Sequence, residues 1–198
     1  MSSNGIDVSN NNGRLVLSTG FSGLDFVIAK RSEGSNYTDA DYDYYEAETA
    51  KVPGCLFGAY HFLHAERQEA ENEALYFLAR INPRALAAGI WIDYETYGSS
   101  PANDREEISL FAETLKARVS GLRIGLYANL TGMRRVCPLD IDEAVDAFWL
   151  AYPGHGPAPV GIMPAGYEWN ICQYETFAGV DRNSSRWAQA EYRTQFAL

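Results

Sequence analysis

Apolar, strand-like segments alternate with helix-like segments over the first two-thirds of the chain, and this alternation limits the possible folds more than any other feature. Strands are expected at residues 6–9, 24–30, 55–63, 90–95 and 123–129. Consecutive strands joined by helices form right-handed βαβ units, because parallel strands need a long crossover connection. The pattern therefore predicts an α/β protein built on a parallel sheet.

The segments between these strands carry helix signals. Residues 66–82 place their apolar side chains on one face, which is typical of an amphipathic helix. A second such helix is expected to begin near Asn103, since Asn103 and Glu106 resemble a capping pair. Residues 39–52 also resemble a helix, whereas residues 31–37 are expected to form a polar loop.

The last third of the chain has weaker helix signals. Further strands are expected at residues 147–152, at residues 169–174 and near Val180, and residues 139–145 offer at most a short helix. Residues 185–196 fit either a closing helix or a loosely packed end. About eight strands in total predict an irregular, TIM-barrel-like (β/α) barrel whose last third is poor in helices, with an open doubly wound sheet as the alternative.

One predicted strand ends in two acidic residues. The segment AGIWIDYETY, residues 88–97, is apolar at first and then carries Asp93 and Glu95, which share one face of a strand while Tyr94 points to the other. Two carboxyls at the end of a buried strand are costly to desolvate unless they are paired or used. Neighbouring carboxyls can also have their pKa values pushed apart, which is the requirement of glycoside hydrolysis. Solvated acids at an ordinary strand end are the alternative.

Composition excludes several classes of partner. The 198 residues carry a formal net charge of −10 with no cluster of basic residues, which argues against binding of nucleic acid or of an anionic membrane surface. The three cysteines form no CxxC pair, so neither a zinc site nor a disulfide framework is expected. The N-terminus has no apolar segment typical of a signal peptide, and no apolar run reaches the ~20 residues of a membrane helix.

Eight short motifs follow one another along nearly the whole chain. They are GIDVS at 5–9, FVIAKRSEG at 26–34, GAYHF at 58–62, IDYE at 92–95, GLYAN at 125–129, FWLAYP at 148–153, CQYE at 172–175 and VDRN at 180–183. In order and approximate spacing they resemble the glycoside hydrolases of family 25, the Ch-type lysozymes, many of which are phage endolysins. The resemblance implies an irregular barrel of eight strands and about five helices. It also implies N-acetylmuramidase activity on peptidoglycan, with no metal or organic cofactor.

The same resemblance assigns roles to four acids. Glu95 matches the general acid, and its protonation is expected to be favoured by partial burial and by an ionised Asp93. Asp93 matches the second catalytic carboxyl, which either attacks the sugar directly or stabilises an intermediate formed by the substrate's own 2-acetamido group. Asp7 and Asp181 match two further acids that hold the sugar or tune the pair.

Nine other residues match positions that line the family's cleft, where aromatic faces stack on sugar rings and polar groups bind their hydroxyl and acetamido groups. These are Lys30, Glu33, Tyr37, Tyr60, Phe62, Tyr127, Trp149, Tyr152 and Gln173. Core packing is the alternative for each aromatic residue. His61 and His64 face opposite sides of a strand, so they are poor joint ligands for one metal, and His61 is expected to be a hydrogen-bonded core residue.

The expected partner is the glycan strand of bacterial peptidoglycan, and the protein is expected to act as a monomer. Residues 1–198 are expected to form a single catalytic domain without a wall-binding module. Such an enzyme would reach the wall after release from a lysing cell or by another secretion route. Two alternatives remain open at this point: a barrel that binds glycan without cutting it, and a glycosidase that acts on another N-acetylated polymer such as chitin.

Overall fold

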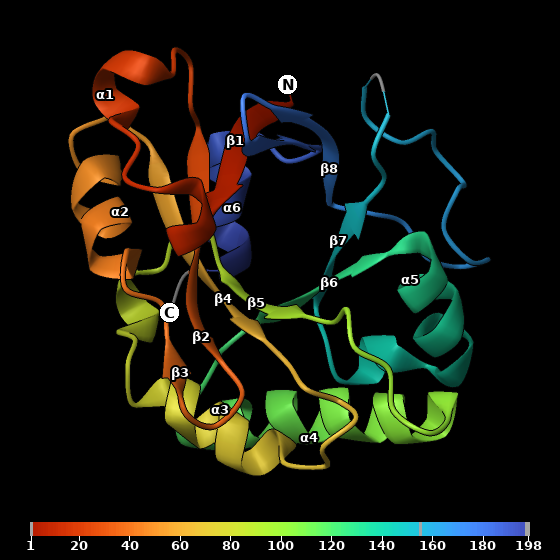
Figure 1. Cartoon of the computed structure of the whole chain (residues 1–198). Helices are drawn as coiled ribbons and strands as arrows, with labels where there is room; N and C mark the ends of the chain where they lie inside the picture. The colour runs from red at the N-terminus through yellow and green to blue at the C-terminus, as the bar shows by residue number, and fades with distance from the viewer. Residues whose placement is uncertain (1, 155, 197–198) are drawn as a thin grey trace.

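The computed structural model describes residues 2–154 and 156–196 (Figure 1). Eight strands form a closed ring, and one two-residue strand pairs outside it. The ring contains β1 (Ser3–Val8), β2 (Phe26–Glu33), β4 (Leu56–Phe62), β5 (Ile90–Asp93), β6 (Ile124–Asn129), β7 (Ala147–Ala151), β8 (Ile171–Phe177) and β9 (Val180–Ser185), while β3 (Tyr37–Thr38) extends the edge of β2. The predicted barrel is thus confirmed, and the open doubly wound sheet is wrong.

The barrel is parallel except at its last strand. Neighbouring strands from β1 through β2 and β4 to β8 run parallel, whereas β9 pairs antiparallel with both β8 and β1. Only Ala178 and Gly179 connect β8 to β9, with φ of 52° and 79°. Two consecutive residues with positive φ match the tight turns that favour hairpins, and a connection this short leaves no room for a crossover helix.

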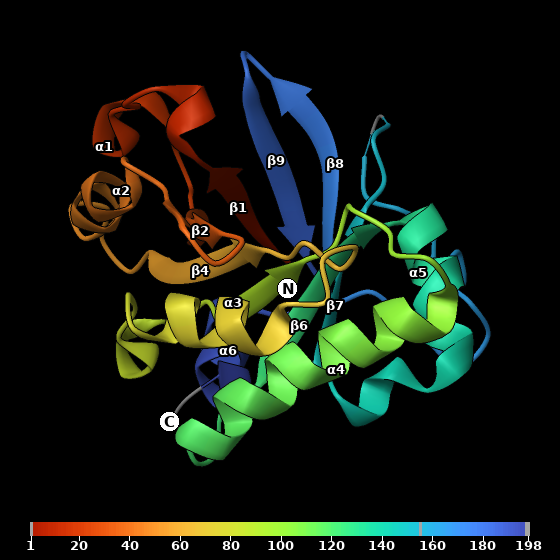
Figure 2. The ribbon, with the colours of Figure 1, turned by 60° about the horizontal axis from the view of Figure 1, so that its bottom comes forward.

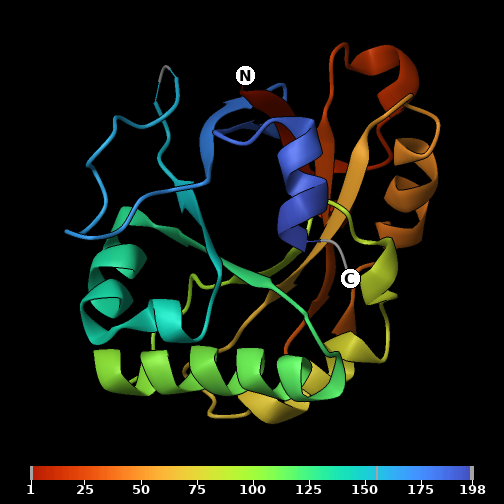
Figure 3. The same ribbon diagram turned by 180° about the vertical axis from the view of Figure 1, so that it is seen from behind.

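The described part of the chain contains six α-helices, which pack on the outside of the barrel or across one end of it. They are α1 (Leu17–Gly20), α2 (Tyr42–Thr49), α3 (Ala70–Leu78), α4 (Pro101–Arg118), α5 (Leu130–Val136) and α6 (Gln189–Phe196). α3 and α4 lie side by side along one side of the strands (Figure 2). α6 crosses the opening at the other end of the barrel from the candidate site described below (Figure 3), and its Tyr192 and Phe196 join the apolar interior.

Several local predictions were wrong. Ser100, not Asn103, caps α4: its hydroxyl accepts a hydrogen bond from the Asn103 backbone N–H at 3.2 Å, and Pro101 occupies the first turn. The expected loop at residues 31–37 is instead the β2–β3 hairpin. α5 was not predicted; its start is capped by the Asn129 side chain. Residues 139–145, by contrast, agree with the expectation of at most a short helix, because they contribute only to two 3₁₀ turns.

The interior of the barrel is filled by large aromatic side chains that need glycine opposite them. Trp91 and Trp149 are almost completely buried, and their rings meet edge to face with centroids 5.6 Å apart. A Cβ atom added to Gly125 on β6 would lie 2.1 Å from Cε3 of Trp91. Gly125 therefore provides the space for the tryptophan that packs beneath the candidate site.

Gly125→Ala is expected to lower the free energy of unfolding by about 1–3 kcal/mol, because Trp91 has to leave its packed position. Urea denaturation followed by tryptophan fluorescence would measure the loss. Gly20→Ala is the matched control, since a Cβ atom there meets nothing within 4 Å. Equal stability of the two variants would contradict this packing account.

No helix in residues 2–154 and 156–196 is both long and apolar enough to cross a membrane.

Candidate active site

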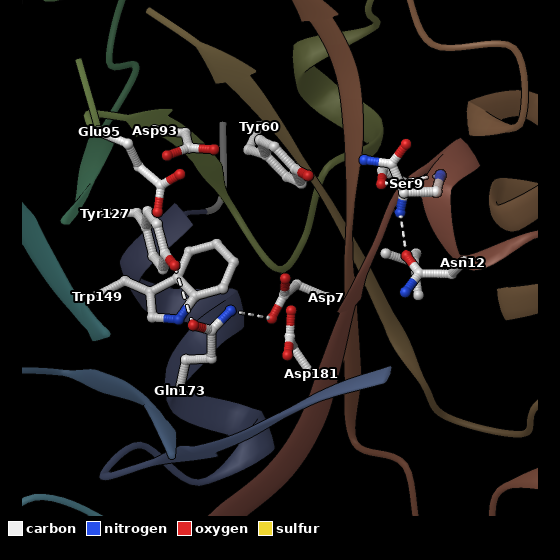
Figure 4. Close-up of a pocket in the computed structure, with 12 residues that line it drawn as sticks. Asp7, Ser9, Asn12, Tyr60, Asp93, Glu95, Tyr127, Trp149, Gln173 and Asp181 are labelled. Atoms are coloured by element: carbon white, nitrogen blue, oxygen red, sulfur yellow. Dashed lines mark hydrogen bonds between the residues drawn. The ribbon is translucent and has the colours of Figure 1, made fainter. Parts of the chain in front are cut away.

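A cavity of about 220 Å³ opens at the carboxyl ends of the barrel strands, where a barrel of this type carries its functional groups (Figure 4). Twelve residues line it: Asp7, Val8, Ser9, Asn11, Asn12, Tyr60, Asp93, Glu95, Tyr127, Trp149, Gln173 and Asp181. Eight of these twelve are among the residues that the sequence predicted for the site. The cavity thus gathers side chains from seven strands and from the loop after β1.

Asp93, the last residue of β5, and Glu95, two residues beyond it, both point into the cavity, as the strand alternation predicted. Tyr94, between them, points away and is fully buried. Its hydroxyl donates to Oδ2 of Asp104 at 2.6 Å, and the Gly98 backbone N–H donates to Oδ1 at 2.6 Å. Arg135 pairs with the same carboxylate. This network holds the backbone on both sides of Glu95, so the orientation of the acidic pair is set from behind the strand.

Asp93 is the deeper member of the pair. It is 7% exposed, and its Oδ1 atom is buried with no hydrogen-bond partner among the described residues. Burial, and secondarily the neighbouring Glu95, raises the pKa of Asp93 well above its usual range, while Lys30 opposes this shift. An orphaned, desolvated carboxyl oxygen at the floor of a cavity is poised to bind a polar group of a ligand.

Glu95 lies nearer the mouth of the cavity and is exposed. Partial desolvation raises its pKa, and contacts with the Tyr127 hydroxyl and Lys30 lower it in part. Both carboxyls therefore favour protonation more than free acids do, and the shift is the larger at Asp93. The sequence-based expectation was an ionised Asp93 beside a protonated Glu95, whereas burial in the free protein favours protonation of Asp93 first.

Asp7, on β1, is held on the opposite wall by amide groups. Oδ2 of Asp7 accepts from Nε2 of Gln173 at 3.0 Å and from Nδ2 of Asn183 at 2.7 Å. The Trp149 indole N–H donates to Oδ1 of Asn183 at 2.8 Å, and the Tyr127 hydroxyl donates to Oε1 of Gln173 at 2.9 Å. These hydrogen bonds fix both aromatic rings around the cavity.

Burial raises the pKa of Asp7 to about 7, and the nearby Asp181 adds to the shift. Because this folded-state pKa lies above the unfolded value of 3.8, the folded protein binds more protons than the unfolded chain at pH values between the two. The contribution of Asp7 to stability therefore falls as the pH rises from about 4 to about 7.

We expect Asp181→Asn to lower the pKa of Asp7, because it removes a like charge. Carboxyl ¹³C NMR titration of both proteins would measure this, and an unchanged or raised pKa would contradict it.

Five of the predicted site residues do not line this cavity. Four of them cluster beside it: Nζ of Lys30 lies 2.5 Å from Oε2 of Glu33 and stands over the rings of Phe62 and Tyr37, at 4.9 and 5.6 Å. Tyr152 instead packs against the hydrophobic core outside the barrel.

The sequence did not predict a role for Asn183 or for the cavity-lining residues of the loop after β1, Ser9, Asn11 and Asn12. Ser9 caps the 3₁₀ turn Asn10–Asn12, and Oδ1 of Asn12 accepts from the Ser9 backbone N–H at 2.7 Å. The run of asparagines after GIDVS was an available signal for this turn. Asn183 ends the motif VDRN, which marked its neighbourhood without indicating that its side chain bridges Trp149 and Asp7.

Neither His61, in the GAYHF segment, nor His64, shortly after it, lines the cavity. His61 is completely buried and is bonded through its ring nitrogens to Ser32 and Glu73, which confirms its expected place in the core. Residues 2–154 and 156–196 contain no group of three or more His, Cys, Asp or Glu side chains arranged to hold a metal ion.

The chain is similar to known lysozymes in sequence and in fold. Over 110 residues it is 33% identical to an autolytic lysozyme of Clostridium acetobutylicum, a match that covers 54% of this chain and 33% of that protein. The chain thus spans about a third of the length of this curated relative.

Solved structures share the whole barrel. A bacterial lysozyme from Streptomyces coelicolor superposes with a TM-score of 0.81 at 24% identity, covering 98% of this chain and 96% of the other. A family GH25 lysozyme from Aspergillus fumigatus gives 0.83 at 20% identity and covers 100% of both chains. The catalytic domain of an endolysin from a bacteriophage of Listeria monocytogenes gives 0.77 at 22% identity, covering 100% and 98%.

The sequence pattern of the family described as "Glycosyl hydrolases family 25" matches residues 6–180. This range includes three of the four candidate acids, and Asp181 follows it directly. The barrel, the acidic cavity and this match agree with one another. The chain belongs to glycosyl hydrolases family 25.

Proposed function

We propose that this protein is a peptidoglycan muramidase that hydrolyses the β-1,4 bond between N-acetylmuramic acid and N-acetylglucosamine. The observation that carries the proposal is the pair Asp93 and Glu95, which lie at the end of β5 and just beyond it and share one cavity at different depths. The lysozymes among its relatives support a peptidoglycan substrate.

In this mechanism Glu95 protonates the departing glycosidic oxygen. Its position at the mouth of the cavity lets it reach a bond between two sugar rings, and its raised pKa keeps a proton available closer to neutral pH than an ordinary glutamic acid would. After the leaving group departs, the ionised Glu95 can accept a proton from the attacking water. One residue thus serves as acid and then as base, as microscopic reversibility requires.

Asp93 acts on the other side of the reacting carbon. We favour a substrate-assisted route, in which the acetamido oxygen attacks the anomeric carbon and Asp93 accepts a hydrogen bond from the acetamido N–H. The buried Oδ1 atom without a partner supports this role, because it can accept such a donor. Donation from the substrate would also favour the ionised form of Asp93 at the moment when positive charge develops on the sugar.

The remaining groups bind and orient the sugars. Tyr60, Tyr127 and Trp149 offer aromatic faces and hydroxyl groups along the cavity wall. Gln173 and Asp181 lie opposite the acidic pair, where they can bind hydroxyl or acetamido groups. Lys30, Glu33, Tyr37 and Phe62 are assigned to a neighbouring sugar position. Tyr152 packs with the core, so it is the least supported of the proposed contacts.

Product analysis would test the bond assignment. Purified peptidoglycan is digested and reduced with borohydride, and the new reducing ends are identified by mass spectrometry. Reduced N-acetylmuramic acid termini are expected from the native protein, and none from Glu95→Gln. Termini of N-acetylglucosamine alone would make the enzyme a glucosaminidase. Cleavage of chitin oligomers but not of peptidoglycan would indicate another N-acetylated polymer, and no cleavage of either would favour a glycan-binding barrel.

A further inference from the structure

A chain of alternating charges runs from the loop after β4 to the lysine beside the active site. Oε1 of Glu66 lies 2.9 Å from Nδ1 of His64, and Nε2 of His64 lies 3.2 Å from Oε1 of Glu33. The other oxygen of Glu33, Oε2, lies 2.5 Å from Nζ of Lys30. We call these four residues the ionic chain. It links two segments of the protein, β2 and the loop after β4, through one imidazole ring.

The two basic members of the ionic chain are shielded from solvent, whereas the Glu33 side chain between them is 33% exposed. The side chains of Lys30 and His64 are 12% and 11% exposed, so salt and water screen their charges less than those of surface pairs. The Lys30 ammonium is further confined between the rings of Phe62 and Tyr37. Its position therefore depends on Glu33, the carboxylate that it contacts.

His64 holds Glu33 in place by bridging two acids. An ionised carboxylate only accepts hydrogen bonds, so an N–H at Nε2 donates to Glu33 and an N–H at Nδ1 donates to Glu66. The ring also packs edge to face on Phe62 with centroids 5.4 Å apart, and its backbone N–H donates to Glu73 at 3.2 Å. A Cβ atom at Gly34 would lie 3.2 Å from Cδ2 of His64, so the turn after β2 also closes on the ring.

Lys30, at the end of the ionic chain, acts electrostatically on Asp93 and Glu95. Lys30 lowers the pKa of both Asp93 and Glu95, and Glu33 raises that of Asp93. His64 and Lys30 together lower the pKa of Glu33. A Glu33 carboxylate held on Lys30 offsets part of the lysine charge. If the carboxylate turned toward solvent, the full lysine charge would act on Asp93 and Glu95 and lower their pKa values further.

We propose that His64 is a positioning residue of the active site, which holds Glu33 on Lys30 through Nε2 and thereby sets how strongly the lysine acts on Asp93 and Glu95. The ring itself does not touch the cavity. The proposal rests on the proposed function only for its effect on catalysis, because its effect on the two carboxyls can be measured without any substrate.

Two amide variants separate this role from a structural one. Glutamine places its amide nitrogen near the position of Nε2, so His64→Gln keeps the donor to Glu33 and loses the one to Glu66. Asparagine mimics Nδ1, so His64→Asn keeps the donor to Glu66 and loses the one to Glu33. Both variants remove the imidazole ring, and any difference between them reports on the link to Glu33.

We expect carboxyl ¹³C NMR to give a lower pKa for Asp93 and Glu95 in His64→Asn than in His64→Gln, by about half a unit or more. The basic limb of the pH profile of kcat/KM should move to lower pH by a similar amount in His64→Asn. Glu33→Gln, which removes the carboxylate itself, should shift Asp93 in the same direction even if a His64 variant folds poorly.

Equal titration of the two His64 variants would overturn the proposal, and so would an unshifted Asp93 in Glu33→Gln. These outcomes are distinct from a failure of the proposed function. If the native protein cleaves no peptidoglycan while the NMR shifts appear as expected, the muramidase assignment fails and the role of His64 stands.

Discussion

Glu95→Gln is expected to fold like the native protein and to lose activity on peptidoglycan by about 10²–10⁴-fold in kcat, the typical contribution of a general acid. Glutamine has nearly the same shape but carries no transferable proton. Because Glu95 is exposed at the mouth of the cavity, the exchange disturbs no packed core. Initial rates of release of soluble muropeptides, with thermal unfolding of the same sample, would measure both quantities.

Glu113→Gln is a suitable control, because Glu113 is exposed on α4 and its exchange for glutamine removes the same charge from the protein. It should retain native activity. If Glu95→Gln kept more than about a tenth of the native kcat, Glu95 would not be the general acid. A parallel loss of structure would leave the test to Glu95→Asp, in which a retracted carboxyl should also lower kcat.

The sequence predicted the barrel well because its strands are defined by local signals. The five barrel strands before residue 130 are apolar runs bounded by polar loops, and all five were located to within three residues at each end. Strand alternation also placed Asp93 and Glu95 on one face and Tyr94 on the other. These inferences need only the period of a strand and no knowledge of its neighbours.

What the sequence could not predict depends on contacts between distant segments. Asn183 meets Asp7 across 176 residues, and its role follows from the antiparallel closure of β9 on β1. The depth of Asp93 relative to Glu95 is likewise a property of the closed barrel. Two residues so near in sequence show the same local pattern, whereas their burial differs because Trp91, Trp149 and the surrounding strands enclose only the first of them.

Helix boundaries failed for a different reason. Asn103 and Ser100 are both good capping residues, and the choice between them was made by Pro101, which fits the first turn of a helix. α5 was missed because LTGMRRV contains a glycine and a threonine, which weaken the local helix signal. Tertiary packing of Met133 and Val136 into the core compensates for this weakness.

Asp93→Asn is expected to inactivate the enzyme while making it more stable. Loss of the carboxylate removes the group that meets the developing positive charge, and we expect kcat to fall by about 10²–10³-fold. The folded state raises the pKa of Asp93 above its unfolded value, so native Asp93 costs stability as the pH rises above that value. An amide cannot ionise, and at pH 8 the variant should gain about 0.5–2 kcal/mol of unfolding free energy.

Urea denaturation at pH 4 and at pH 8 would separate the two parts of this prediction, because the gain in stability should be larger at pH 8. Asp104→Asn provides the matched comparison. Asp104 is just as buried, but its carboxylate accepts from Tyr94 and Gly98 and pairs with Arg135, so an amide should destabilise the protein. Opposite signs for the two variants would show that a buried carboxyl is retained at residue 93 for its chemistry and at residue 104 for structure. A destabilised Asp93→Asn at pH 8 would instead mean that Asp93 is a structural acid, and the role of its free Oδ1 in catalysis would have to be abandoned.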